Sequence, residues 1–382
     1  ARWHDKFSDD LRDMGFSACI AEPDIWMREI DGKWEYVAVY VDDLAFALHD
    51  PESFVKQLES KYEYKLKGTG EIAFHLGCDF FRDKDNTLCM APRKYIEKMV
   101  AGYTHMFGEK PTERFKSPLE KGDHPELDTS ELLDPDGIQR YQSLIGSIQW
   151  AVSIGRIDVA TAVMSLSSYR AAPRKGHLQR AKRVVGYLSG MRHGVIRFRT
   201  GIPDHTDITL SKHTWDNSIY GNPSEAIPHD IPKALGKPVV LTAYVDANLY
   251  HNTLTGRSVT GTLHFMNQTP IQWYSKKQET VETATYSSEF VAARTCVEQI
   301  IDIRMTLRYL GVPIQGCTHM FGDNESVVNS SMIFEHKLHK RHTALSIHRV
   351  REAISASICQ FHHLPGKYNP VDILSKHWGY ND

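Results

Sequence analysis

The feature that most constrains the fold is an apolar stretch with two adjacent carboxylates inside it, residues 35–48 (EYVAVYVDDLAFAL). Both flanks of the acidic pair are β-branched, aromatic or aliphatic, which is typical of short β-strands. We therefore expect a β-hairpin with Asp42 and Asp43 at its tip or just past it. Two carboxylates this close repel each other and resist joint burial, and a Mg²⁺ ion relieves both costs. An acidic turn without a metal is the plainer alternative.

The composition favours two or three globular domains in a reducing compartment. The chain has 382 residues, of which 41% are hydrophobic and 24% charged. It has no run of eighteen apolar residues, which argues against a membrane span. Its six cysteines are scattered and form no CxxC pair, so neither a zinc ribbon nor a disulfide framework is expected. The formal net charge of −2 counts mildly against a nucleic-acid enzyme but leaves room for local basic faces.

The first half of the chain alternates helical and extended patterns, as an α+β unit does. Apolar residues at helical spacing predict helices over residues 4–14, 52–61 and 92–100. The expected strands cover residues 62–66, 72–81 and 87–90.

A polar segment separates this unit from a helical one. Residues 110–138 are rich in Pro, Asp, Glu and Gly, which predicts a linker or an extended surface strap. Helical periodicity returns over residues 141–169 and 175–190. The second of these helices carries Lys175, His177, Arg180, Lys182 and Arg183. They form either an ordinary solvated face or a strip that follows a phosphate backbone.

Residues 200–237 have no periodicity and mark the best domain boundary. Beyond it, strands are expected over residues 239–246, 258–266, 271–274, 318–321 and 358–364. Helices are expected over residues 287–310, from 326 onward, over 343–357 and after Pro370. Three strands as a meander, followed by alternating helices and strands, predict a mixed sheet with helices on its faces.

Four acids of the second half stand at the ends of these elements: Asp246, Glu289, Asp323 and Asp372. Each alone has an innocent explanation as a helix cap or a first-turn acid. Together, around one sheet, they could converge on two Mg²⁺ ions about 4 Å apart, the arrangement that hydrolyses phosphodiesters.

The sequence motifs around these acids resemble those of the ribonuclease H domain of copia-type LTR retrotransposons. The matching motifs are YVDA (244–247), TGRSVTG (255–261), WYSKKQ (273–278), SSEFVA (287–292), HRVRE (348–352) and NPVDILSK (369–376). In the first half, YVDD (40–43) resembles the YxDD signature of reverse transcriptases, and SPL (117–119) and YQSLIGS (141–147) follow the family pattern. The chain departs from it at residues 155–158, where the family usually has Arg-Pro-Asp.

The resemblance implies the C-terminal part of a Pol polyprotein, with a partial reverse-transcriptase palm (1–110), a strap and helical thumb or connection (111–199), a variable insert (200–237) and a ribonuclease H-like domain (238–382). Asp246, Glu289, Asp323 and Asp372 would hold Mg²⁺, or Mn²⁺, and cleave RNA in RNA/DNA hybrids. Asp42 and Asp43 would be the polymerase pair, whose third Asp we expect to lie before Ala1, so this chain should not polymerise DNA alone. The implied partners are RNA template, DNA, the hybrid and the rest of Pol, in cytoplasmic virus-like particles or the nucleus.

Several alternatives stay open. His362 or His363 could assist product release or be structural, and Arg341, Arg349 and Arg351 could line the hybrid path. A zinc site is the less favoured interpretation of the histidines at 336, 339, 342 and 348. The whole chain could also be a hybrid-binding remnant without activity, or a remnant that merely folds.

Overall fold

A computed structural model describes residues 2–206, 208, 210, 218, 221–332 and 343–377. The chain forms two compact units. The first comprises Ala1–Leu76, Ala226–Val239 and Ile301–Gln315, and the second comprises Gly77–Glu225, Val240–Ile300 and Gly316–Asp382. None of the described helices is both long and apolar enough to cross a membrane.

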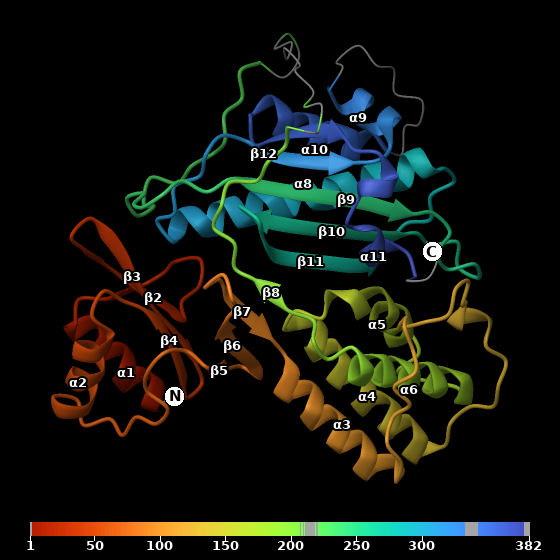
Figure 1. Ribbon diagram of the computed structural model, residues 1–382. Helices are drawn as coiled ribbons and strands as arrows, with labels where there is room; N and C mark the ends of the chain where they lie inside the picture. Colours follow the sequence, from red (N-terminus) through yellow and green to blue (C-terminus); the bar gives the residue numbers. More distant parts are fainter. Residues whose placement is uncertain are drawn as a thin grey trace. The chain divides into compact units, whose positions relative to one another are not determined.

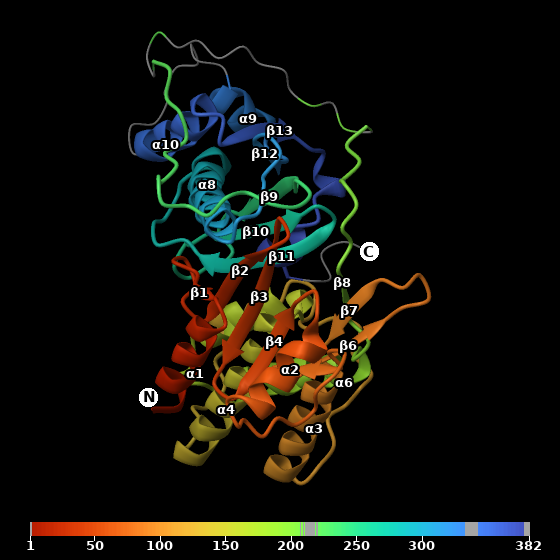
Figure 2. The same ribbon diagram turned by 90° about the vertical axis from the view of Figure 1, so that its left-hand side faces the viewer.

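The first unit is built on an antiparallel sheet in the order β1-β2-β3-β4 (Figure 1 and Figure 2). Its strands are β1 (Ser17–Ala18), β2 (Ile25–Ile30), β3 (Lys33–Tyr40) and β4 (Asp43–Ala47). Helices α1 (Arg2–Asp13) and α2 (Pro51–Ser60) share one apolar core with the sheet, to which Phe7, Trp26 and Phe54 contribute. Asp50 caps α2 by accepting the Ser53 N–H, and Pro51 takes the first helical position, where its missing N–H costs nothing.

The predicted strand over residues 62–66 is wrong. This segment pairs with no strand among the described residues: Glu63 has a left-handed backbone, φ +60°, and the alternating tyrosines contact helix α1. The Tyr62 hydroxyl donates to Asp13 at 2.5 Å, and the Tyr64 hydroxyl donates to Asp10 at 2.7 Å.

The N-terminal part of the second unit combines a small antiparallel sheet with a helical bundle. The sheet has the order β5-β6-β7-β8, with β5 (Phe74–His75), β6 (Cys78–Arg82), β7 (Leu88–Ala91) and β8 (Ile196–Arg197). The helices are α3 (Arg93–Phe107), α4 (Pro135–Ser153), α5 (Ala160–Ser167) and α6 (Lys175–Gly190), with short 3₁₀ turns η1 (Pro125–Leu127) and η2 (Ile157–Val159). Helices α3, α4, α5 and α6 bury one continuous apolar core.

Of the predicted strap over residues 110–138, the last four residues belong to α4, which begins at Pro135. Acids of the remaining segment, together with Glu109, pair with the basic face of α6. Arg180 donates to Asp123 at 2.9 Å and to Asp128 at 2.5 Å. Lys182 and Arg183 pair in the same way with glutamates 109 and 120. Because these cations are paired with the chain's own acids and are only 18–23% exposed, they disfavour a strip that follows a phosphate backbone.

The C-terminal part of the second unit is a five-stranded mixed sheet in the order β11-β10-β9-β12-β13 (Figure 1). The strands are β9 (Leu241–Asn248), β10 (Val259–Met266), β11 (Thr269–Lys277), β12 (Thr318–Gly322) and β13 (Cys359–His363). The pairs β11–β10 and β10–β9 are antiparallel, whereas β12 runs parallel to both β9 and β13. The helices are α8 (Thr285–Tyr309), α9 (Glu325–Met332), α10 (Ala344–Ser355) and α11 (Asp372–Ser375), with the turn η4 (Gly366–Tyr368). This confirms the predicted mixed α and β fold, with a mixed sheet and accompanying helices.

The compact units do not coincide with the predicted boundaries. Residues 77–110, expected in the palm, belong to the second unit, because α3 packs against α4 and α6. Residues 301–315, expected in the ribonuclease H-like domain, are grouped with the first unit, where the Tyr36 hydroxyl donates to the Leu310 carbonyl at 2.6 Å. Part of the predicted insert 200–237 lies outside the described residues.

Candidate active site

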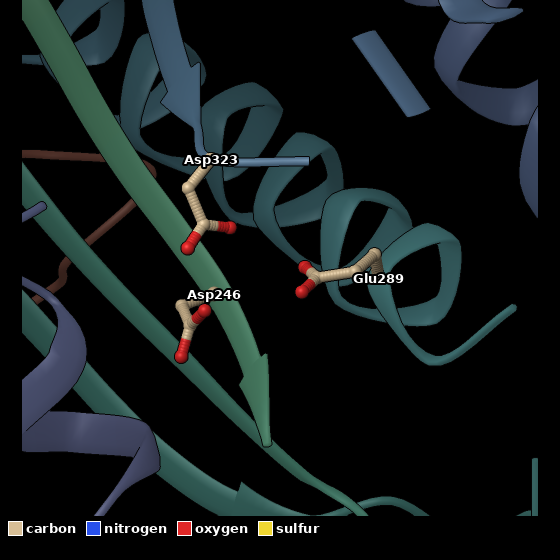
Figure 3. A group of neighbouring side chains, drawn as sticks. All are labelled: Asp246, Glu289 and Asp323. Carbon is tan, nitrogen blue, oxygen red and sulfur yellow. The ribbon is translucent and has the colours of Figure 1, made fainter. Parts of the chain in front are cut away.

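Three of the predicted acids converge at one end of the mixed sheet (Figure 3). Asp246 lies on β9, Glu289 near the start of α8, and Asp323 directly after β12. One carboxylate oxygen of each lies within 4.8 Å of those of the other two, and within the described ranges this is the only such group of at least three His, Cys, Asp or Glu residues.

The strand register explains why Asp246 and Asp323 lie close together. Strands β9 and β12 are parallel neighbours in which Tyr244 lies opposite Phe321. Since side chains two residues apart share a face, Asp246 and Asp323 follow these aromatic residues on the same face, at the carboxyl ends of both strands. Asp246 is 1% exposed and Glu289 is 6% exposed, so two of the carboxylates are almost completely withdrawn from water.

Burial and mutual repulsion make this group costly to ionise. Burial, followed by the charges of Asp246 and Asp323, raises the pKa of Glu289 well above its ordinary value. Burial also raises the pKa of Asp246 and of Asp323. A divalent cation would relieve this penalty, and carboxylate oxygens are the ligands that Mg²⁺ and Mn²⁺ favour. The donor set therefore fits the metal that the sequence predicted.

The fourth predicted acid, Asp372, lies beside this group and is joined to it by a lysine. Lys376 Nζ donates to Asp372 Oδ1 at 2.7 Å and lies 3.4 Å from Asp246 Oδ2. The Ser375 hydroxyl also donates to Asp246 Oδ2. Burial alone would lower the pKa of Lys376, but Asp246 and Asp372 raise it, so the ammonium stays charged among the acids. The sequence motif contained Ser375 and Lys376, but their spacing alone did not reveal this contact.

The predicted polymerase pair lies in the first unit, at the tip of the β3–β4 hairpin. Tyr40 pairs with Asp43, so Val41 and Asp42 form the turn, and both acids are exposed. Val41 has φ +53°, a left-handed conformation that costs a β-branched residue about 1–2 kcal/mol. Within the described ranges, no third potential ligand joins Asp42 and Asp43 in a cluster.

The remaining candidate residues have structural partners. His362 is fully buried, and its Nε2 lies 3.1 Å from Nδ1 of His319, as expected for a structural histidine. His363 Nε2 lies 3.1 Å from the backbone oxygen of Asp323, at the edge of the acid cluster. Arg351 is buried and donates to the Ser330 carbonyl, so it does not line an open path.

Arg349 pairs with Glu352 on the surface of α10. Arg341 and the candidate zinc ligands His336, His339 and His342 lie outside the described residues.

Comparison with known proteins identifies the relatives of this chain. No protein-family model matches it. It is 22% identical over 98% of its length to the retrovirus-related Pol polyprotein from transposon TNT 1-94 of Nicotiana tabacum, and 23% identical over 98% to that from transposon RE1 of Arabidopsis thaliana. A putative transposon Ty5-1 protein of Saccharomyces cerevisiae is 26% identical over 78% of this chain and 84% of its own length.

Over nearly its whole length the chain is similar to retrovirus-related Pol polyproteins of Ty/copia-type transposons. It spans about a quarter of the length of the two plant polyproteins, 26% and 23% respectively. Among solved structures, ribonuclease H1 from Halobacterium salinarum NRC-1 aligns at 15% identity with 35% of this chain and 93% of its own, with a TM-score of 0.29. The foamy viral protease-reverse transcriptase aligns at 10% identity with 64% of this chain and 50% of its own, with a TM-score of 0.26. The fold assignment rests on the strand order and register rather than on these alignments.

Proposed function

We propose that this chain hydrolyses the RNA strand of RNA/DNA hybrids with divalent metal ions, as the ribonuclease H part of a copia-type Pol polyprotein. The observation that supports this most is the convergence of Asp246, Glu289 and Asp323 within 4.8 Å, two of them almost completely buried. Such a group is expensive to maintain in a protein without a cation, and it stands where the resemblance predicts a catalytic centre.

The proposed roles of the four acids are those that the resemblance to copia-type ribonuclease H domains implies. Asp246, which also contacts Lys376, would contact both ions, while Glu289 and Asp323 would hold the ion on the leaving-group side. Asp372, which pairs with Lys376, would release this lysine and hold the ion on the water side. Bound Mg²⁺ would activate a water molecule and stabilise the leaving oxygen, giving 5′-phosphate and 3′-hydroxyl products. Recognition would depend on minor-groove shape and 2′-hydroxyl groups rather than on base sequence.

The polymerase function would be incomplete in this chain. The hairpin presents Asp42 and Asp43, but within the described ranges no third acid approaches them. We therefore propose that RNA-directed DNA synthesis needs residues from the rest of Pol. Primer extension by the purified chain on an RNA template would contradict this. The other proposed partners are the RNA template, DNA and the polyprotein itself, in cytoplasmic virus-like particles or the nucleus.

The test of the proposed nuclease is cleavage of an end-labelled RNA strand in an RNA/DNA hybrid. The purified chain with Mg²⁺ should cut the hybrid but not the same RNA alone, and EDTA should stop the reaction. Asp323→Asn should fold as the parent does and cut at least about a hundredfold more slowly, since it loses one charged ligand of the metal. A folded parent chain that binds the hybrid but never cuts it would refute the nuclease and favour the hybrid-binding alternative.

A further inference from the structure

Helix α11, which carries Asp372, is too short to hold itself in place. It has four residues and ends with a hydrogen bond from the Lys376 N–H to the Asp372 carbonyl at 2.8 Å. The last carbonyls of any helix need partners from elsewhere. The orientation of Asp372 therefore depends on what surrounds α11.

One side of α11 presses against the backbone of β10 at Gly261. A Cβ added to Gly261 would lie 3.0 Å from the carbonyl carbon of Leu374 and 3.1 Å from the Ser375 nitrogen. Gly261 is also the β10 partner of Asp246 in the sheet. The absence of a side chain here lets α11 approach the catalytic strand closely enough for Ser375 to reach Asp246.

Helix α11 is also held by α5, which the sequence assigned to the thumb or connection. The Thr161 hydroxyl donates to the Ile373 carbonyl at 2.7 Å, and Thr161 is only 3% exposed. Next to it, Ala160 packs in an apolar cluster with Val371 and Leu374, the buried residues on either side of that carbonyl. The bond thus satisfies a carbonyl of α11 that has no partner within the helix.

We propose that Thr161 is a positioning residue for the metal site, which acts by fixing α11 and hence the carboxylate of Asp372. The inference rests on the proposed function, because it assigns Asp372 to the metal. It extends the catalytic unit beyond the predicted boundary at residue 238, since α5 completes the support of the active site. The side chain of Thr161 needs only its hydroxyl for this role, so serine should replace it and valine should not.

The test compares Mn²⁺ affinity, measured by calorimetry on the whole chain, in the parent, Thr161→Val and Thr161→Ser. Loss of the hydrogen bond should weaken Mn²⁺ binding roughly two- to tenfold in the valine variant, while the serine variant should bind as the parent does. Thr104→Val is a matched control, because the Thr104 hydroxyl also donates to a backbone carbonyl, that of Val100 at 2.9 Å, but within α3. It should leave Mn²⁺ affinity unchanged. Gly261→Ala, which displaces α11 from β10, should weaken binding as Thr161→Val does.

Three results would overturn the proposal: unchanged Mn²⁺ affinity in folded Thr161→Val, an equal loss in Thr161→Ser, or an equal loss in Thr104→Val. Calorimetry measures metal binding without hybrid cleavage, so a failure of the Thr161 proposal can be distinguished from a failure of the proposed nuclease. A parent chain that binds Mn²⁺ but cuts no hybrid would refute the proposed nuclease, and the same comparison of variants would still decide the role of Thr161.

Discussion

Removing the charge of Glu289 should stabilise the metal-free protein while destroying its metal site. Glu289 is 6% exposed and has the Asp246 and Asp323 carboxylates as neighbours. Burial and these charges raise its pKa well above 4.5, so the folded state holds the proton more tightly than the unfolded state does. The contribution of the protonated Glu289 carboxyl to folding stability is therefore fully present below about pH 4.5, and it is lost as the pH rises through the raised pKa. Glutamine has no proton to lose, so Glu289→Gln escapes this loss.

The size of the effect follows from the linkage between pKa and stability. While Glu289 stays protonated in the fold, each pH unit above 4.5 costs about 1.4 kcal/mol of folding free energy. The cost reaches at most about 5 kcal/mol by pH 8, and less if the raised pKa lies below that pH. Glutamine can still accept a backbone N–H through its amide oxygen. We therefore expect Glu289→Gln to be more stable than the parent near pH 8 and nearly equal to it near pH 5.

The assay is calorimetric unfolding in EDTA across this pH range, which follows the transition of each unit. Glu298→Gln is the matched control, because Glu298 lies on the same helix but pairs with Arg294 at the surface, half-exposed. It should change stability by less than about 0.5 kcal/mol at either pH. Saturating Mg²⁺ should then stabilise the parent but not Glu289→Gln. The reasoning is refuted if Glu289→Gln is no more stable than the parent at pH 8, or if the difference does not widen with pH.

Two further substitutions test the first unit. Gly311 ends α8 at φ +68°, and a Cβ there would lie 2.2 Å from Trp34 Nε1, so Gly311→Ala should destabilise this unit by at least about 1–2 kcal/mol. An unchanged thermal transition of that unit would contradict the packing. Glu35 is 2% exposed and accepts from Arg28 at 2.8 Å and from the His49 N–H at 2.7 Å, so Glu35→Ala should cost about 3 kcal/mol at neutral pH in denaturant unfolding. Burial would raise the pKa of Glu35, but these donors lower it overall. The stabilisation by Glu35 should thus be present above pH 4.5 and lost as the carboxylate gains a proton at lower pH. If Glu35→Ala were equally destabilising in acid, the ion pair with Arg28 would not be its cause.

The sequence was sufficient to predict the helices and strands whose apolar residues recur with a regular period along one buried face. The helix over 175–190, the hairpin around Asp42 and the strands of the mixed sheet all appear where their periodicity placed them. The convergence of Asp246, Glu289 and Asp323 was also foreseeable, because acids at the ends of neighbouring strands and of a covering helix meet at one edge of a sheet.

What the sequence could not predict depends on contacts between distant segments. Alternating tyrosines suggested a strand over residues 62–66, but their hydroxyls bond to acids of α1. The basic face of α6 suggested a nucleic-acid path, but its partners lie in a strap some fifty to seventy residues earlier. Lys376 contacts both Asp246 and Asp372. This contact depends on the packing of α11 against β10 and α5, which no local sequence pattern predicts.

The most direct test of the metal site is a crystal structure of the chain soaked in Mn²⁺, with anomalous data collected at the manganese edge. The account predicts an anomalous peak bounded by the carboxylates of Asp246, Glu289 and Asp323, with Lys376 displaced from Asp246. An Asp323→Asn crystal treated identically should show a weakened peak or none. A map without a peak among these three acids, with Lys376 still in contact with Asp246, would contradict the assignment of this cluster as a metal centre.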